Sequence, residues 1–153
     1  MRGYFSIGVE RLSKPMNAGN LFRSAHAFGA SYVYTIGGSY QANGARSDTS
    51  KSVNHIPHYH YDSFEDLTLP VDCILVGIEL VDEAKILPSF KHPLKASYLL
   101  GPEKGNISDQ LLDKCKYIIK IPTKFCVNLA IAGAIVMYDR SISLGNYNIR
   151  SLK

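Results

Sequence analysis

The chain has 153 residues, 46 % of them hydrophobic and 20 % charged, which is typical of a globular domain and excludes an intrinsically disordered protein. Its longest apolar run, near residues 131–138, is far shorter than the ~20 residues of a membrane-spanning helix, and no signal peptide precedes the first strand-like segment. The net charge is +4, with basic residues gathered in 2–23 and 114–124, and this favours a polyanionic partner such as RNA, although solvated surface charge explains single residues equally well.

The first half of the chain predicts strands that alternate with short helices. Residues 4–9 alternate like a strand, and a helix capped by Asn17 follows, with apolar residues at helical spacing as far as Phe28. Residues 31–36 predict a second strand, residues 37–49 a polar loop, and residues 55–61 a short aromatic strand. Ser63 is then placed to cap a helical turn over residues 64–67.

The second half continues this alternation. Residues 73–78 are almost wholly apolar, as expected of a strand that is covered on both faces, and residues 97–100 and 117–121 predict two more strands. Ser108 is placed to cap a helix over 109–115, and the final helix runs from about Asn128 to Ser143. The pattern predicts an α/β fold with a mainly parallel sheet flanked by helices, in a single domain over residues 1–153.

Glycine or proline interrupts three of these strands near their carboxyl ends, where parallel sheets bind ligands. The interruptions are Gly77, Gly101-Pro102 and Pro122. A strand glycine lets a ligand approach the backbone, although a bulge explains Gly77 alone equally well. The chain has no GxGxxG after the first strand and no GxxxxGK[ST], which argues against a dinucleotide or triphosphate site. A pocket of bent strand ends therefore suits a neutral or cationic adenosine ligand better than a polyphosphate.

Three segments carry a resemblance to a known family. They are Asn17-Ala18-Gly19-Asn20-Leu21-Phe22-Arg23, Leu100-Gly101-Pro102-Glu103-Lys104-Gly105, and Ile121-Pro122-Thr123 running on to Asn128-Leu129-Ala130. In this order the chain resembles the SpoU-like (TrmH-type) branch of the SPOUT RNA 2′-O-ribose methyltransferases. The resemblance implies a SPOUT-type α/β knot with a C-terminal trefoil, although threaded chains are rare among proteins. It also implies transfer of a methyl group from S-adenosylmethionine to a ribose 2′-hydroxyl of tRNA, in its anticodon loop, or of rRNA.

The same resemblance assigns the site. It makes Asn17, Arg23, Glu103 and Asn128 the catalytic residues. The residues expected to hold S-adenosylmethionine are Gly77, Leu100, Gly101, Pro102, Gly105, Ile121, Pro122, Cys126, Asn128 and Leu129. The family often has serine where this chain has Cys126, and a thiol is a weaker hydrogen-bond donor than a hydroxyl. That departure favours the alternative function, a non-catalytic RNA-binding or cofactor-binding module with the same fold.

Each proposed catalytic residue also has a simpler interpretation. Arg23 fits a solvated surface arginine, Glu103 a turn residue, and Asn128 the N-cap of the final helix. In a functional role, Arg23 either activates the ribose hydroxyl or binds a phosphate, and a guanidinium that stays protonated makes the phosphate contact the easier of the two. Glu103 either holds the cofactor loop through backbone amides or lies near the methylsulfonium.

The final helix and the cysteines bear on assembly and location. The helix is apolar nearly all round and therefore must be buried on more than one side. Gly133 costs it ~1 kcal/mol relative to alanine, which close packing against a partner helix, for example across a dimer, would offset. The resemblance implies such a homodimer, with Arg23 acting at the partner's cofactor pocket. Three cysteines without CxxC spacing predict free thiols, buried at Cys73 and Cys115, in a cytoplasmic protein.

The histidines of residues 55–60 invite a metal hypothesis that the sequence does not support. His58 and His60 would share one face of a strand, but no cysteine or carboxylate is well placed to complete a site. We therefore expect no metal, and we interpret the segment as a packed strand or as aromatic side chains that stack on RNA bases.

Overall fold

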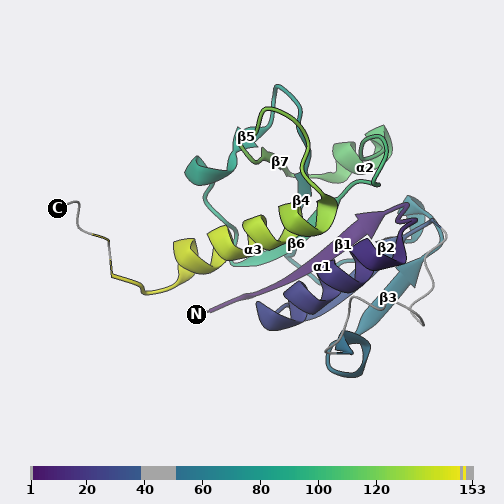
Figure 1. The fold of residues 1–153 in the computed structure, drawn as a ribbon, viewed down its shortest axis with the longest axis horizontal. Helices are drawn as coiled ribbons and strands as arrows, with labels where there is room; N and C mark the ends of the chain where they lie inside the picture. The colour runs from purple at the N-terminus through teal and green to yellow at the C-terminus, as the bar shows by residue number, and fades with distance from the viewer. Residues whose placement is uncertain (1, 39–50, 149, 151–153) are drawn as a thin grey trace.

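The computed structural model describes residues 2–38, 51–148 and 150 (Figure 1). Within them, one sheet of seven strands has the order β3-β2-β1-β6-β4-β7-β5, and every neighbouring pair is parallel. The strands are β1 (Tyr4–Glu10), β2 (Tyr32–Ile36), β3 (His58–Tyr61), β4 (Ile74–Ile78), β5 (Lys85–Ile86), β6 (Lys95–Leu100) and β7 (Tyr117–Lys120). The predicted α/β class is confirmed, and most of the predicted polar loop over 37–49 lies outside the described residues.

Three α-helices cover the two faces of this sheet. They are α1 (Pro15–Ala27), α2 (Asp109–Lys114) and α3 (Leu129–Leu144), and short 3₁₀ turns lie at Ser52–Asn54, Phe64–Asp66 and Leu87–Ser89. In Figure 1, α1 and α3 lie side by side on one face, and α2 lies apart from them beside β4 and β7. None of the helices that the structure describes is long and apolar enough to cross a membrane.

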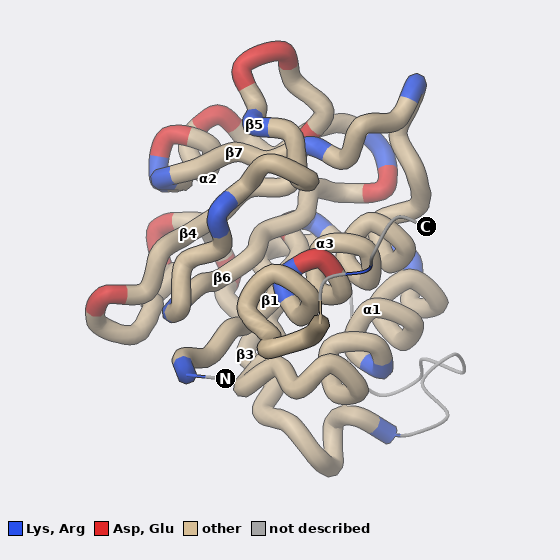
Figure 2. The backbone as a smooth tube through the Cα atoms, turned by 90° about the vertical axis from the view of Figure 1, so that its left-hand side faces the viewer, with Lys and Arg blue, Asp and Glu red and all other residues tan. Residues whose placement is uncertain are grey.

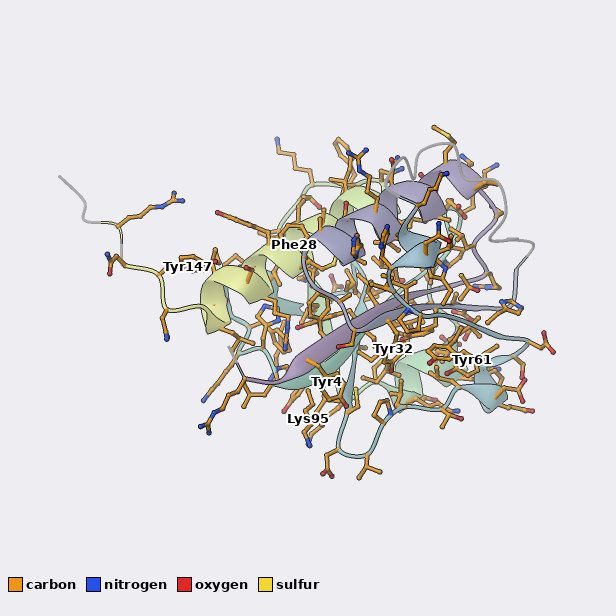
Figure 3. All side chains as sticks on the ribbon, turned by 90° about the horizontal axis from the view of Figure 1, so that it is seen from below. Tyr4, Phe28, Tyr32, Tyr61, Lys95 and Tyr147 are labelled. Carbon is orange, nitrogen blue, oxygen red and sulfur yellow. The ribbon has the colours of Figure 1, made fainter. Side chains whose placement is uncertain are left out.

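Alternating residues of the strands divide the core between the two faces. Phe5, Ile7 and Val9 of β1 pack with α1 and α3 in the larger cluster of buried apolar residues. The intervening residues face the other way, where the Ser6 hydroxyl donates to Ser97 Oγ at 2.8 Å. Figure 3 shows Tyr4, Tyr32 and Tyr61 on this second face, opposite α1 and α3.

The beginnings of the helices partly correct the predicted caps. α1 begins at Pro15, a residue type favoured in the first turn, so that Asn17 lies inside the helix with a buried side chain and is not its cap. Ser108 precedes α2 as predicted, but its hydroxyl is buried and has no hydrogen-bond partner among the described residues. Asn128 does cap α3, because its Oδ1 accepts the backbone N–H groups of Ala130 and Ile131 at 2.9 and 3.4 Å.

Gly133 permits the close packing against another helix that the sequence suggests, but that helix is α1 of the same chain and not one across a dimer. A Cβ added at Gly133 would stand 2.4 Å from Leu21 Cδ1 of α1. It would also stand 3.3 Å from methyl groups of Ile7 and Leu100 in the sheet. The glycine thus lets α3 settle against both α1 and the sheet.

The order of the strands brings the predicted site residues together. β6, β4 and β7 are neighbours, so the segments that follow them start at the same edge of the sheet. These segments are 101–108 after β6, 79–84 after β4, and 121–128 after β7. The trefoil knot expected in this region stays a prediction.

Candidate active site

A pocket of about 440 Å³ opens at this edge. Its walls come from residues 78–80 after β4, 100–106 after β6 and 120–129 after β7, with Lys14 and Asn17 from the beginning of α1. The predicted site residues that line it are Asn17, Leu100, Gly101, Pro102, Glu103, Gly105, Ile121, Cys126, Asn128 and Leu129. The structure therefore gathers in one cavity residues that are up to 112 positions apart in sequence.

Three predicted residues do not line this pocket. Gly77 faces α2, because a Cβ added there would stand 3.1 Å from Cys115 Sγ. The neighbours of Gly77 along the chain, Ile78 and Glu79, reach the pocket instead. Pro122 is exposed and lies outside the lining, and Arg23 lies in a different hollow.

Three of the four proposed catalytic residues form one hydrogen-bonded chain. Asn128 Nδ2 donates to Asn17 Oδ1 at 2.9 Å, and Asn17 Nδ2 donates to Glu103 Oε1 at 3.3 Å. Each residue comes from a different one of the three segments that carry the family resemblance, and 86 and 111 positions separate the bonded pairs. The three segments are thus held together by their own polar side chains.

Glu103 also closes the beginning of α1. Its carboxylate accepts the backbone N–H groups of Ser13 at 3.2 Å and Lys14 at 2.8 Å, together with the Ser13 hydroxyl at 3.0 Å. Lys14 is the N-cap residue of α1 and Ser13 directly precedes it, and a negative charge is favourable at this end of a helix. Partial burial alone would raise the pKa of Glu103, but the hydrogen bonds from its own loop, Lys14, Ser13 and Asn17 outweigh burial and lower that pKa. Of the two roles expected for Glu103, the geometry supports the one that holds the loop.

Arg23 lies outside the hydrogen-bonded chain. It is exposed, and the structure shows no hydrogen bond or ion pair from its guanidinium to any described residue. A second hollow, between α1 and α3, is lined by Arg23, Asn20 and Ser24 and by Asn128 and Ile131. Asn128 borders both this hollow and the pocket, so it separates Arg23 from the pocket within one chain.

Several of the basic residues noted in the sequence are held by backbone carbonyls. Lys114 Nζ donates to Phe64 O at 3.0 Å, Lys120 Nζ donates to Val81 O at 3.1 Å, and Arg11 Nη2 donates to Asn106 O at 2.8 Å. In Figure 2 the basic residues are interspersed with acidic ones over the loops and helix ends. The part of the chain that the structure describes contains no group of three residues able to hold a metal ion.

The pocket also contains residues that sequence reasoning missed, namely Glu79, Lys14 and Lys120. Glu79 directly follows the buried strand β4. The rule that pointed to Gly101 and Ile121, that ligands bind beyond the carboxyl ends of parallel strands, would have found it. The three cysteines are free, with Cys126 exposed and Cys73 and Cys115 partly buried. Burial raises the pKa of the Cys115 thiol to about 12.

Comparisons with known proteins identify the fold and the family of the chain. The model of the SpoU rRNA Methylase family matches residues 4–138. An AdoMet-bound rRNA methyltransferase from Sinorhizobium meliloti superposes with a TM-score of 0.85 and 22 % identity, over 95 % of this chain and 59 % of that one. The SpoU methyltransferase AviRb from Streptomyces viridochromogenes superposes with a TM-score of 0.81 and 20 % identity, over 92 % of this chain and 60 % of that one. The chain therefore spans about three fifths of the length of these two proteins.

A solved structure from work on the 2-OH methylation of C/U34 on tRNA is matched over nearly its whole length by this chain. It gives a TM-score of 0.79 at 20 % identity, over 94 % of this chain and 92 % of that one. No curated protein matches the sequence. At these identities the structures show a shared fold, and the family model covers most of the chain. The chain therefore belongs to the SpoU rRNA methylase family.

Proposed function

We propose that this protein is an S-adenosylmethionine-dependent methyltransferase that modifies a ribose 2′-hydroxyl of RNA, with tRNA as the substrate and rRNA as the second candidate. The observation that carries the proposal is the chain Glu103–Asn17–Asn128, which joins the three family segments at the wall of the pocket. The structure from work on tRNA methylation, which this chain matches over nearly its whole length, supports tRNA as the substrate. The free cysteines are consistent with a cytoplasmic protein.

The pocket fits the cofactor in size and in chemistry. Its volume of about 440 Å³ lies within the range of small-molecule sites. Apolar side chains of Ile78, Leu100 and Ile121 can enclose an adenine ring, and Gly101 and Gly105 leave backbone groups open to polar contacts. When bound, S-adenosylmethionine supplies a methyl group on a cationic sulfonium. Leu100–Pro102, Gly105, Ile121, Cys126 and Asn128–Leu129 would hold it.

The other residues position the RNA. An arginine side chain stays protonated in proteins, so we assign Arg23 to a phosphate beside the target nucleotide. All the hydrogen bonds of the Glu103 carboxylate that the structure shows run to the beginning of α1 and to Asn17, so we assign Glu103 to holding the segments in place. Asn128 borders both hollows and is placed to contact the ribose between them.

The exposed face of α3 favours a homodimer. Ile131, Ile135, Tyr138 and Ile142 are 55, 37, 49 and 46 % exposed, and their spacing puts them on one face of the helix. Ile131 also lines the hollow that contains Arg23, so this apolar stripe begins at the proposed substrate site. By the family resemblance, a second copy that covers the stripe would place its own pocket near Arg23. We therefore propose that Arg23 acts at the partner's cofactor site.

Two measurements test the assembly. Light scattering should give twice the 16.9 kDa chain mass for the native protein and the chain mass for Ile135→Glu; a native monomer at micromolar concentration would contradict the dimer. Mixing Arg23→Ala chains with Gly101→Val chains then tests the shared site, because a side chain at Gly101 would meet Ile107 N at 2.9 Å. Shared sites predict that the mixture regains activity, and self-contained sites predict that it does not.

The activity is tested by incubating the protein with labelled S-adenosylmethionine and bulk RNA. We expect labelled RNA, with the modified nucleotide mapped to a single ribose. Arg23→Ala should abolish transfer, whereas Arg2→Ala, which removes an exposed arginine at the N-terminus, should not. Binding of cofactor and RNA without transfer would favour the alternative, a non-catalytic module.

A further inference from the structure

The pocket lies between two segments that are paired where they leave the sheet, at Ile78 and Leu100, and beyond that pair the Glu79 side chain connects them. One wall is residues 78–80, which leave the sheet at the end of β4, and the facing wall is residues 100–106, which leave it at the end of β6. Neither wall is held by the hydrogen bonds of a strand along its whole length. What fixes their separation therefore decides whether the pocket is ready for a ligand.

Glu79 connects the first wall to Ile107, the residue that directly follows the second wall. Its Oε1 accepts the backbone N–H of Leu80 at 3.0 Å, and its Oε2 accepts the backbone N–H of Ile107 at 2.9 Å. Each oxygen of one ionised carboxylate thus holds a different segment, and hydrogen bonds to a charged acceptor are about twice as strong as neutral ones. Glu79 itself lines the pocket.

The residues next to Ile107 are held from outside the pocket. The Glu10 carboxylate accepts the Ser108 N–H at 2.7 Å, and Arg11 Nη2 donates to Asn106 O at 2.8 Å. Neither Glu10 nor Arg11 lines the pocket, and both come from the end of β1. Three consecutive residues of the loop are therefore each bound by a charged side chain, and of these side chains Glu79 is the one that faces the ligand.

We propose that Glu79 is a positioning residue of the cofactor site, which presets the distance between the two pocket walls before the cofactor binds. The inference rests on the proposed function. Without the carboxylate, the 101–108 loop keeps its anchors to β1 but loses the hydrogen bond that ties it to the β4 wall. The cofactor must then order that wall itself, which weakens its binding.

The first test titrates S-adenosylhomocysteine into the 153-residue chain by calorimetry. We expect Glu79→Gln to raise Kd about tenfold, the equivalent of about 1.4 kcal/mol. Glu83→Gln is the matched control, because Glu83 is exposed in the same segment after β4 and its replacement removes the same charge. It should leave Kd unchanged. An equal Kd for Glu79→Gln and native protein, even with a lower unfolding temperature, would show a purely structural role and overturn the inference.

The second test is hydrogen exchange at the Ile107 amide, which reports on the wall without any assay of activity. In the ligand-free protein, Glu79→Gln should speed exchange of this amide about tenfold, while the Ser108 amide, which Glu10 holds, should change little. Saturating S-adenosylhomocysteine should slow exchange at Ile107 in both proteins. Unchanged exchange in the variant would refute the role of Glu79. A native protein that binds no S-adenosylhomocysteine would instead refute the proposed function.

Discussion

Replacing Asn17 by aspartate changes a single group at the centre of the hydrogen-bonded chain. The remaining carbonyl-type oxygen can still accept from Asn128 Nδ2, but the other oxygen replaces the amide that donates to Glu103 Oε1 at 3.3 Å. Two acidic oxygens then face each other beside a buried helix turn. Asn17→Asp therefore tests whether this contact is a real hydrogen bond, while it leaves the shape of the side chain almost unaltered.

Two responses compete at neutral pH. If both carboxylates ionise, charges 3.3 Å apart repel each other by ~5 kcal/mol at an effective dielectric constant of ~20. If the introduced carboxyl keeps its proton and donates it to Glu103, the cost is ~1.4 kcal/mol for each pH unit above its ordinary pKa of ~3.9. That cost is about 4 kcal/mol at pH 7, so protonation is the preferred response. The hydrogen bonds that lower the pKa of Glu103 keep the proton on the introduced group.

The pH dependence has a definite sign. Because the folded-state pKa of the introduced carboxyl is raised, the penalty is absent below pH ~4 and grows as the pH rises toward that raised pKa. We expect the free energy of unfolding to fall by at most about 4 kcal/mol at pH 7 and by about 1.5 kcal/mol at pH 5, since solvent screening reduces both figures.

Urea unfolding at pH 5 and pH 7 measures this difference. Asn20→Asp is the matched control, because it makes the same substitution in the same helix at an exposed position. Equal stabilities of the two variants at pH 7 would refute the reasoning. So would a loss of stability in Asn17→Asp that is as large at pH 5 as at pH 7.

Two further predictions concern the core. Gly133→Ala gains up to ~1 kcal/mol of helix propensity, but its Cβ would stand 2.4 Å from Leu21 Cδ1, and overpacking of this kind costs ~1–3 kcal/mol. Urea unfolding should therefore show that the free energy of unfolding falls by about 1 kcal/mol. A stabilised variant would contradict the packing argument. Burial lowers the pKa of His92 by more than its hydrogen bond to Asp139, at 2.8 Å, raises it. The protein should therefore have its full stability above pH ~6.5, the pKa of histidine in the unfolded chain, and lose stability as the pH drops below that value. Between pH 7.5 and 5.5, the unfolding temperature of His92→Gln should fall less than that of the native protein.

Sequence reasoning succeeded where a feature depends on neighbouring residues. The apolar runs of β1, β4 and β6 end at Gly, Pro or charged residues, so their extent and the edge at which their carboxyl ends meet follow from local pattern. The cap at Asn128 was predicted for the same reason. β5, Lys85–Ile86, was missed because two residues carry no periodicity.

Where a feature depends on contacts between distant residues, local pattern fails. Asn17 looked like a helix cap, but its side chain is turned inward to Glu103 and Asn128, 86 and 111 residues away. Gly133 suggested a dimer contact, but Leu21 of the same chain fills the space. Gly77 was assigned to the pocket because it lies near the end of β4, whereas the alternation of the strand directs it toward Cys115.

Because Arg23 forms no hydrogen bond or ion pair with the described residues, its loss by mutation during evolution would differ from that of the other three proposed site residues. Loss of Asn17, Glu103 or Asn128 leaves polar partners unmatched and weakens the fold, whereas Arg23 is exposed and bonded to no residue that the structure describes. A lineage released from methyl transfer would therefore discard Arg23 early, while selection for folding alone would preserve the other three. Under the proposed function, retention of Arg23 is thus the more telling observation about activity, because its guanidinium forms no hydrogen bond or ion pair with a described residue.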